Sequence, residues 1–189
     1  MASGQKSYFI KLAKNRTNAL EFTDKPVNDG IIARVLEAAR WAPSHHNSQP
    51  WKFIVVKNKE TIRKLMELAH YGFFHADPSA MIVAIIEPLS EDRKGLLKGK
   101  VKEMTDYHYF LTISMPVLNM QYQAEQEGIG SCILSLTIPE ANEILNVPKQ
   151  DSAILTVGLG YLPKKRHIEP KKRKKLSELV YYEKFGRKR

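Results

Sequence analysis

The chain has 189 residues, 43% of them hydrophobic and 26% charged, which is the composition of a globular protein with one domain, here expected to span residues 1–189. The single cysteine, Cys132, excludes an internal disulfide framework and a CxxC redox pair, and it favours a reducing cytoplasmic environment. Residues 1–16 hold no signal-peptide core, and the longest apolar run, 80–86, is too short to cross a bilayer, so we expect no membrane partner.

The formal net charge of +10 is concentrated at one end of the chain. The C-terminal arm, residues 163–189, holds 12 Lys or Arg and 3 Asp or Glu, which leaves 18 against 17 in the rest of the chain. Such an arm could bind nucleic acid through salt-dependent contacts with phosphates. The sequence does not show the stacking aromatics on a strand that are typical of RNA-binding modules, so nucleic-acid binding is the less favoured alternative.

Helical and extended patterns alternate irregularly along the chain. In chain order we expect helix 7–14, helix 29–41, strand 51–57, helix 59–70, strand 81–87, helix 90–102, helix 107–126, helix 139–145 and strand 153–159. Asn28 is the expected cap of the second helix, and Pro43 ends it. Pro116 is expected to kink the long helix or to start a new one. Strands scattered among helices without strict βαβ alternation favour an α+β fold.

The C-terminal arm is too apolar for a solvated tail and too isolated to fold on a core of its own. Its apolar residues are Leu176, Leu179, Val180, Tyr181, Tyr182 and Phe185. We therefore expect the arm to dock on a partner, and a second subunit is the natural candidate.

Four segments, 15–27, 38–56, 127–134 and 158–180, together resemble the nitroreductase family, and their order covers essentially the whole chain. The most specific motif is PSxxNxQPW after an AAxxA helix end, with Pro43, Ser44, Asn47, Gln49, Pro50 and Trp51 in place. The resemblance implies an α+β homodimer with a central mixed or antiparallel sheet flanked by helices. It also implies that the C-terminal arm is exchanged between subunits and that two FMN sites are built from both.

The same resemblance implies a function. Members of the family take hydride from NADH or NADPH onto FMN and pass it, by a ping-pong mechanism, to a nitroaromatic, a quinone or a related small acceptor. Because the flavin performs the redox chemistry, no catalytic acid or base side chain is expected. Reductive dehalogenation and oxidative breakdown of the flavin, which also occur in the family, stay open as alternatives.

An FMN phosphate accepts charge-assisted hydrogen bonds best from guanidinium groups. Arg16 occupies the position of the family's first phosphate-binding arginine, and Lys171 with Arg173 match its Lys-x-Arg motif. The resemblance also implies cofactor contacts by the neighbours of Arg16, Thr17 and Asn18. Without it, Arg16 would be interpreted as a solvated charge and the arm as a generic basic patch.

Two positions depart from the family pattern. Members usually carry Ser two places after the first arginine and a basic residue two places later, whereas this chain has Asn18 and Leu20. Asn18 can still hydrogen-bond the ribityl chain or the phosphate. Leu20 cannot supply charge at the pyrimidine edge, where negative charge develops at N1 and O2 on reduction. His75 is a weak replacement, and a partly exposed histidine is the simpler interpretation.

Two loops are expected to approach the flavin ring. From the other subunit, the resemblance implies contacts by Pro43, Ser44, His45 and Asn47. From loop 127–130 it implies contacts by Gly128, Ile129 and Gly130, with the backbone of Ile129 and Gly130 directed at flavin N5, which accepts the hydride. Small residues here let the chain approach the ring edge, which a Cβ would obstruct.

Three further features have simpler interpretations than the chemistry they suggest. The adjacent histidines at 45–46 could suggest a metal, but the other histidines show no ligand spacing with them, so none is expected. Cys132 could be a nucleophile, although a buried inert thiol is favoured. The glycine pairs in GIGS and GLGY lack the strand, third glycine and helix of a dinucleotide-binding fold. The nicotinamide should therefore visit an open flavin face.

Overall fold

The computed structural model describes residues 7–44, 47–69, 76–87, 102–165 and 171–188, with only the backbone for 102–110. In chain order its elements are α1 (Tyr8–Asn15), α2 (Asp29–Arg40), β1 (Trp51–Val56), α3 (Lys59–Glu67), β2 (Ala80–Ile86), α5 (Lys102–Gln126), β3 (Gly130–Ser135), α6 (Ile138–Leu145), β4 (Ser152–Gly160) and α7 (Leu176–Leu179). Helices and strands are mixed without βαβ units, which confirms the predicted α+β class.

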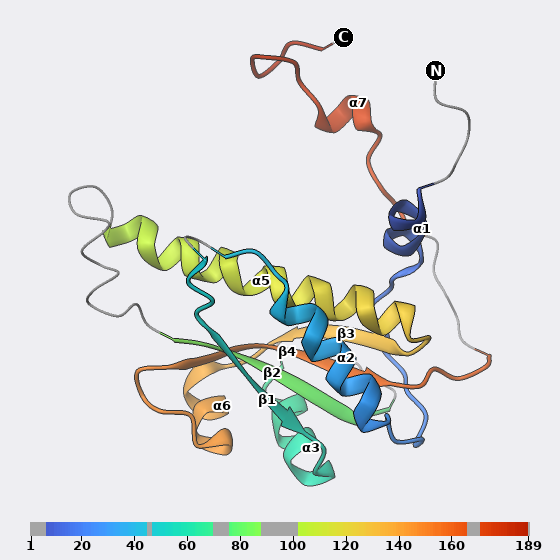
Figure 1. Cartoon of the computed structure of the whole chain (residues 1–189), viewed down its shortest axis with the longest axis vertical. Helices are drawn as coiled ribbons and strands as arrows, with labels where there is room; N and C mark the ends of the chain where they lie inside the picture. The colour runs from blue at the N-terminus through green and yellow to red at the C-terminus, as the bar shows by residue number, and fades with distance from the viewer. Residues whose placement is uncertain (1–6, 45–46, 70–75, 88–101, 166–170, 189) are drawn as a thin grey trace.

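The four strands form one sheet in the order β1-β2-β4-β3, and every neighbouring pair is antiparallel. Helices α2 and α5 cover one face of the sheet, and α3 and α6 lie against the other (Figure 1). Strand β2 is buried along its whole length because both of its faces are covered. Its side chains alternate between the two cores, with Met81 and Val83 in one and Ile82 and Ala84 in the other.

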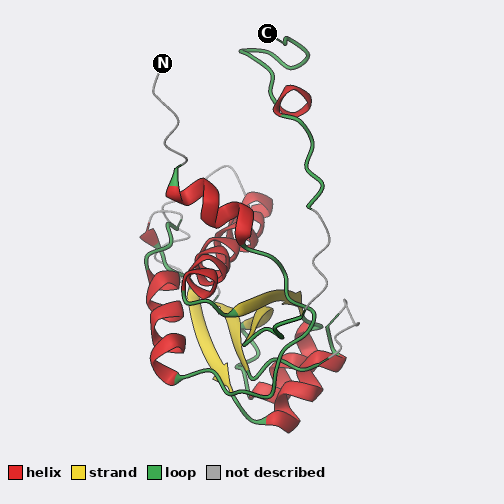
Figure 2. Ribbon diagram, turned by 90° about the vertical axis from the view of Figure 1, so that its right-hand side faces the viewer, coloured by secondary structure: helices red, strands yellow, loops and turns green. Residues whose placement is uncertain are grey.

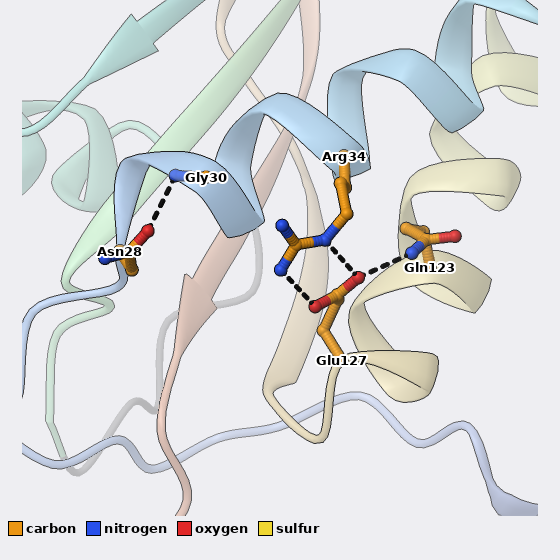
Figure 3. A network of polar contacts seen from close by, with 5 residues as sticks. All are labelled: Asn28, Gly30, Arg34, Gln123 and Glu127. Carbon is orange, nitrogen blue, oxygen red and sulfur yellow. Dashed lines mark hydrogen bonds and ion pairs between the residues drawn. The ribbon is translucent and has the colours of Figure 1, made fainter.

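Helix α2 begins as the sequence predicts. The Asn28 side chain accepts a hydrogen bond from the backbone N–H of Gly30 at 2.7 Å, which satisfies one of the unpaired donors at the helix start (Figure 3). Its apolar stripe, which includes Ile32, Val35 and Ala39, packs on α5. A hydrogen bond also joins the two helices, because the Asn119 side chain on α5 donates to the backbone carbonyl of Ala38 on α2 at 3.0 Å.

One expectation for the chain after residue 100 is wrong, and one of two alternatives at Pro116 is not found. No strand was expected between 126 and 139, yet β3 forms an edge of the sheet there, because Cys132, Leu134 and Leu136 alternate into the core beside α3 and α6. Of the two outcomes expected at Pro116, a kink or a new helix, the new helix is not found, because α5 continues through the proline. The helix expected at 90–102 lies almost entirely outside the described residues.

The described part of the C-terminal arm leaves the body of the protein (Figures 1 and 2). Its short helix α7 was not expected from the sequence. Leu176 is 77% exposed and Phe185 is 92% exposed, so these apolar side chains find no core within their own chain. Within the described ranges, no helix is long and apolar enough to cross a membrane.

Candidate functional site

The segment that follows α1 runs beside the start of β3. Asn18 forms a parallel bridge with Ser131, and the backbone N–H of Ala19 donates to the carbonyl of Ser131 at 2.8 Å. The expected phosphate-binding residue Arg16 and the loop that was expected to face flavin N5 therefore lie close together in one subunit. Thr17, between Arg16 and Asn18, is half-buried.

Lys171, from the C-terminal arm, contacts the end of α1. Its ammonium donates to the backbone carbonyls of Asn15 at 3.1 Å and Arg16 at 2.5 Å, and also to that of Lys14. Carbonyls at the end of a helix carry partial negative charge and lack helical partners, so a cation is favourable there. Lys171 thus caps α1 and fixes the backbone that carries Arg16.

Lys171 lies within the electrostatic influence of two further cations at the end of α1. Burial lowers the pKa of Lys171, and the positive charges of Arg16 and Arg173 lower it further. Arg173 itself donates to the carbonyl of Lys172 at 2.8 Å. The charges of Arg16 and Arg173 therefore both act on Lys171, which also contacts the backbone of Arg16, although the arm is far from Arg16 in the sequence.

Asn18 is held in one orientation by two donors. Its Oδ1 accepts hydrogen bonds from Arg16 Nη1 at 3.2 Å and from Gln121 Nε2 at 2.9 Å. A guanidinium can only donate, so the atom of Asn18 that faces Arg16 must be the oxygen, and the amide nitrogen points elsewhere as a donor. Gln121, 2% exposed in α5, was missed by sequence reasoning. A polar residue within an apolar helix was the available signal.

The loop between α5 and β3 is a helix C-cap built on glycine. Gly128 has φ of 73°, its N–H donates to the carbonyl of Glu125 at 3.1 Å, and that of Ile129 donates to Ala124 at 3.0 Å. This is the Schellman pattern, in which glycine adopts the left-handed conformation without strain. A contact between Ile129 N–H and flavin N5 would have to share a hydrogen that the helix end already uses.

Packing inside the chain explains the small size of Gly130. A Cβ added at Gly130 would overlap the Leu162 side chain and lie 3.1 Å from the Cβ of Ala19, whereas one added at Gly128 would meet nothing within 4 Å. The structure thus gives Gly130 a reason other than approach to the flavin. The GLGY pair lies within β4, where a Cβ at Gly160 would meet Phe22 at 2.5 Å, so it marks strand packing and no nucleotide loop.

A polar network fixes the same loop from the side (Figure 3). Arg34 on α2 donates from Nε and Nη2 to the two carboxylate oxygens of Glu127, each at 2.7 Å, and Gln123 donates to Glu127 at 2.8 Å. The hydrogen bonds from Arg34 hold the pKa of Glu127 below its ordinary value. Sequence reasoning missed this pair, since its partners are 93 residues apart.

The described residues of the PSHHN loop make hydrogen bonds with Gln49, which follows it. Ser44 Oγ accepts from the N–H of Gln49 at 3.0 Å, and the Gln49 side chain donates to the Asn47 carbonyl at 3.2 Å and to its Oδ1 at 3.1 Å. Asn47 and Gln49 have φ of 52° and 48°. Pro43 and Asn47 are exposed and Ser44 is half-buried, while His45 and His46 lie outside the described residues. In the described ranges, no cluster of three or more potential ligands could hold a metal ion.

The two halves of the expected flavin site do not meet within one chain. Residues 43–44 and 47–50 lie toward the Lys102 end of α5, whereas α1 lies toward its Gln126 end (Figure 1). An aromatic contact supports this position of α1. Phe9 of α1 packs edge to face on Tyr122, which lies near the Gln126 end of α5, with ring centroids 5.3 Å apart. A site that uses both Arg16 and Asn47 therefore needs two subunits.

Comparison with known proteins decides the family. The sequence pattern of the nitroreductase family matches residues 13–113. The chain belongs to the nitroreductase family. A protein of Archaeoglobus fulgidus, provisionally named an NADH dehydrogenase/NAD(P)H nitroreductase, is 29% identical over 160 residues, which cover 80% of this chain and 84% of that one. An NADH dehydrogenase of Thermus thermophilus is 33% identical over 79 residues, or 42% of this chain and 38% of that one.

Solved structures show the same fold. A nitroreductase family protein from Streptococcus pneumoniae superposes with a TM-score of 0.80 and 25% identity over 92% of this chain and 99% of that one. A Clostridium difficile protein described as an FMN-dependent nitroreductase gives a TM-score of 0.76 and 24% identity over 93% and 99%. The predicted nitroreductase-like fold is confirmed.

Cys132→Ala is expected to leave NAD(P)H oxidation and flavin content unchanged. Cys132 is 1% exposed, and burial raises the pKa of its thiol to about 12, so the reactive thiolate is scarce at neutral pH. Steady-state rates and flavin absorbance of the variant check this expectation. Loss of turnover at full flavin occupancy would show that the thiol takes part in the reaction.

Proposed function

We propose that this protein is an FMN-dependent oxidoreductase that takes hydride from NADH or NADPH and reduces a nitroaromatic, a quinone or a related small acceptor. The gathering of Arg16, Lys171 and Arg173 at the end of α1 is the observation that carries the proposal. The charges of Arg16 and Arg173 disfavour the ammonium of Lys171, that of Glu125 favours it, and a bound anion would favour it further. A phosphate monoester, with close to two negative charges, suits this donor set.

Each residue of the cluster has its own part in holding FMN. The guanidinium groups of Arg16 and Arg173 would bind the phosphate, and the amide nitrogen of Asn18 would donate to the same cofactor. Lys171 adds charge and keeps the backbone of Arg16 in place, because its own three donors are used by carbonyls. The bound FMN would supply a ring that accepts hydride and later gives it to the acceptor.

The exposed apolar surface of α5 supports a homodimer. Leu111, Met115 and Leu118 recur at spacings of four and three residues, so they share one face of the helix, and all three are exposed. Trp41, just before the PSHHN loop, is exposed as well. Contiguous apolar surface of this kind marks a protein interface. In such a dimer, loop 43–50 would complete the flavin site of the other subunit, and the C-terminal arm would dock on it.

The double substitution Met115→Glu with Leu118→Glu is expected to convert the dimer to monomers and to reduce bound FMN to a small fraction. Two charges on this face would have to be buried unpaired in the interface. Sedimentation and flavin absorbance measure both effects. Val55→Glu is the matched control, since it places a charge on an exposed apolar residue of β1, away from α5. A double variant that stays dimeric would disprove the proposed interface.

The proposed reaction is tested by separating its two halves. Under anaerobic conditions, NADH or NADPH alone should bleach the flavin absorbance, and a quinone or a nitroaromatic added afterwards should restore it. Bleaching that requires both substrates at once would contradict the ping-pong scheme. Halide release from a halogenated substrate, or loss of the flavin during turnover in air, would favour dehalogenation or flavin breakdown instead.

A further inference from the structure

We propose that Gln121 is a positioning residue that, through Asn18, holds the guanidinium of Arg16 in place for an anion. The inference rests on the proposed function, in which that anion is the phosphate of FMN. Gln121 lies in α5 and need not touch the cofactor itself. Its side-chain Nε2 donates to Asn18 Oδ1 at 2.9 Å, and the same oxygen accepts a hydrogen bond from Arg16 Nη1 at 3.2 Å.

The guanidinium of Arg16 fixes the direction of both hydrogen bonds. Because a guanidinium can only donate, the side-chain atom of Asn18 that faces it is the oxygen. An amide oxygen can only accept, so the atom of Gln121 that faces Asn18 is the amide nitrogen. Exchanging oxygen and nitrogen in either amide would lose at least one of the two contacts. The three side chains therefore form one directed chain of hydrogen bonds between α5 and the guanidinium.

Global stability is a weak explanation for a glutamine at position 121. Gln121 is 2% exposed, and Met120 and Ala124, which lie beside it in α5, belong to the apolar core. A buried amide needs its hydrogen bond to offset the cost of leaving water, whereas an apolar side chain of similar shape pays no such cost. The role of Gln121 therefore lies in what it holds, which is the exposed side chain of Asn18.

The backbone around Arg16 is fixed as well. The ammonium of Lys171 donates to the carbonyl of Arg16 at 2.5 Å, and Asn18 forms a bridge with Ser131 of β3. Arg16 is therefore held both at its backbone and at its guanidinium. A guanidinium has more N–H donors than the contact with Asn18 uses, so it can still bind an anion. Because a side chain that is already held loses less freedom on binding, this arrangement favours tight binding.

The charges near Arg16 favour an anion as the ligand. The positive charge of Arg16 lowers the pKa of Lys171, and that of Arg173 acts in the same direction. The amide nitrogen of Asn18 adds a donor without adding a negative charge. Without the hydrogen bond from Gln121, the amide of Asn18 could rotate at the surface, and the guanidinium would lose its fixed acceptor.

The test measures the affinity of the full-length apoprotein for FMN and for riboflavin, which has no phosphate, and takes the ratio of the two. Gln121→Met keeps the length of the side chain and removes the donor, so it should lower this ratio about three- to tenfold, the range for one hydrogen bond. In an Arg16→Ala background the same change should leave the ratio within about twofold, because Gln121 acts through Arg16. A purely structural role would weaken both ligands equally.

Gln123→Met is the matched control, because it removes a glutamine hydrogen bond from the same helix, here to Glu127, and it should leave the ratio unchanged. Asn18→Ala breaks the link at the surface and should lower the ratio at least as much, which keeps the test decisive if Gln121→Met fails to fold. An unchanged ratio in either variant would overturn the proposal, and so would an equal effect of Gln121→Met with and without Arg16. Wild-type protein that binds no FMN would instead disprove the proposed function, so the two failures are distinguishable.

Discussion

Arg16→Ala is expected to weaken FMN binding by about 1.5 to 3 kcal/mol, the contribution of a hydrogen bond to a charged group. Arg16 lies at the convergence of α1, β3 and the C-terminal arm, where Lys171 holds its backbone carbonyl. Arg173→Ala should have an effect of the same size, because its guanidinium would bind the same phosphate. Titration of the apoprotein with FMN, followed by fluorescence quenching, measures both.

Riboflavin and a distant lysine provide the controls for Arg16. Riboflavin has no phosphate, so wild-type protein and Arg16→Ala should bind it almost equally. Lys188→Ala, at the far end of the arm, should leave FMN affinity nearly unchanged, although Lys188 carries the same charge. An equal loss of riboflavin and FMN affinity in Arg16→Ala would mean that Arg16 is structural, as a partner of Asn18, and would remove the phosphate assignment.

Truncation after Leu162 is expected to abolish both the dimer and stable flavin binding. It removes Lys171, which leaves the carbonyls at the end of α1 without their cation, and it removes Arg173 from the phosphate site. It also removes the apolar side chains of the arm, which have no core within their own chain. Sedimentation and flavin content of the truncated protein measure the two losses together.

A second variant separates the two roles of the arm. Leu176→Ser with Phe185→Ser keeps every cation of the arm and removes two of its most exposed apolar side chains. It should weaken the dimer while monomer and dimer fractions retain comparable affinity for inorganic phosphate. A truncated protein that remains dimeric with full FMN occupancy would show that the arm has neither role.

Local sequence patterns were enough to find the elements whose residues repeat at a fixed spacing. The helix after Asn28 and the buried strand around Val83 were predicted nearly to the residue, because cap chemistry and apolar spacing are local properties. Strand β3 was missed because Gly130 and Ser131 disfavour extended structure, and its stability comes from pairing with β4. Packing on neighbouring strands decides such segments.

The residues of the candidate site also fall into those that the sequence indicated and those that it did not. The family motif indicated Arg16, Lys171 and Arg173, and the structure places Lys171 on the backbone carbonyl of Arg16, with Arg173 two residues further along the arm. The family motif did not indicate Gln121, Arg34 or the role of Lys171 as a helix cap. These contacts join segments that are distant in the sequence, and a polar residue on a helix carries no mark of its partner.

The absorbance spectrum of the full-length protein, purified without added flavin and analysed by mass spectrometry of the released cofactor, tests the central claim most directly. The proposed function predicts a yellow protein that releases one FMN for each chain of a dimer. A colourless protein that takes up no FMN on titration, and that copurifies with nucleic acid in a salt-dependent manner, would contradict it and favour binding through the C-terminal arm.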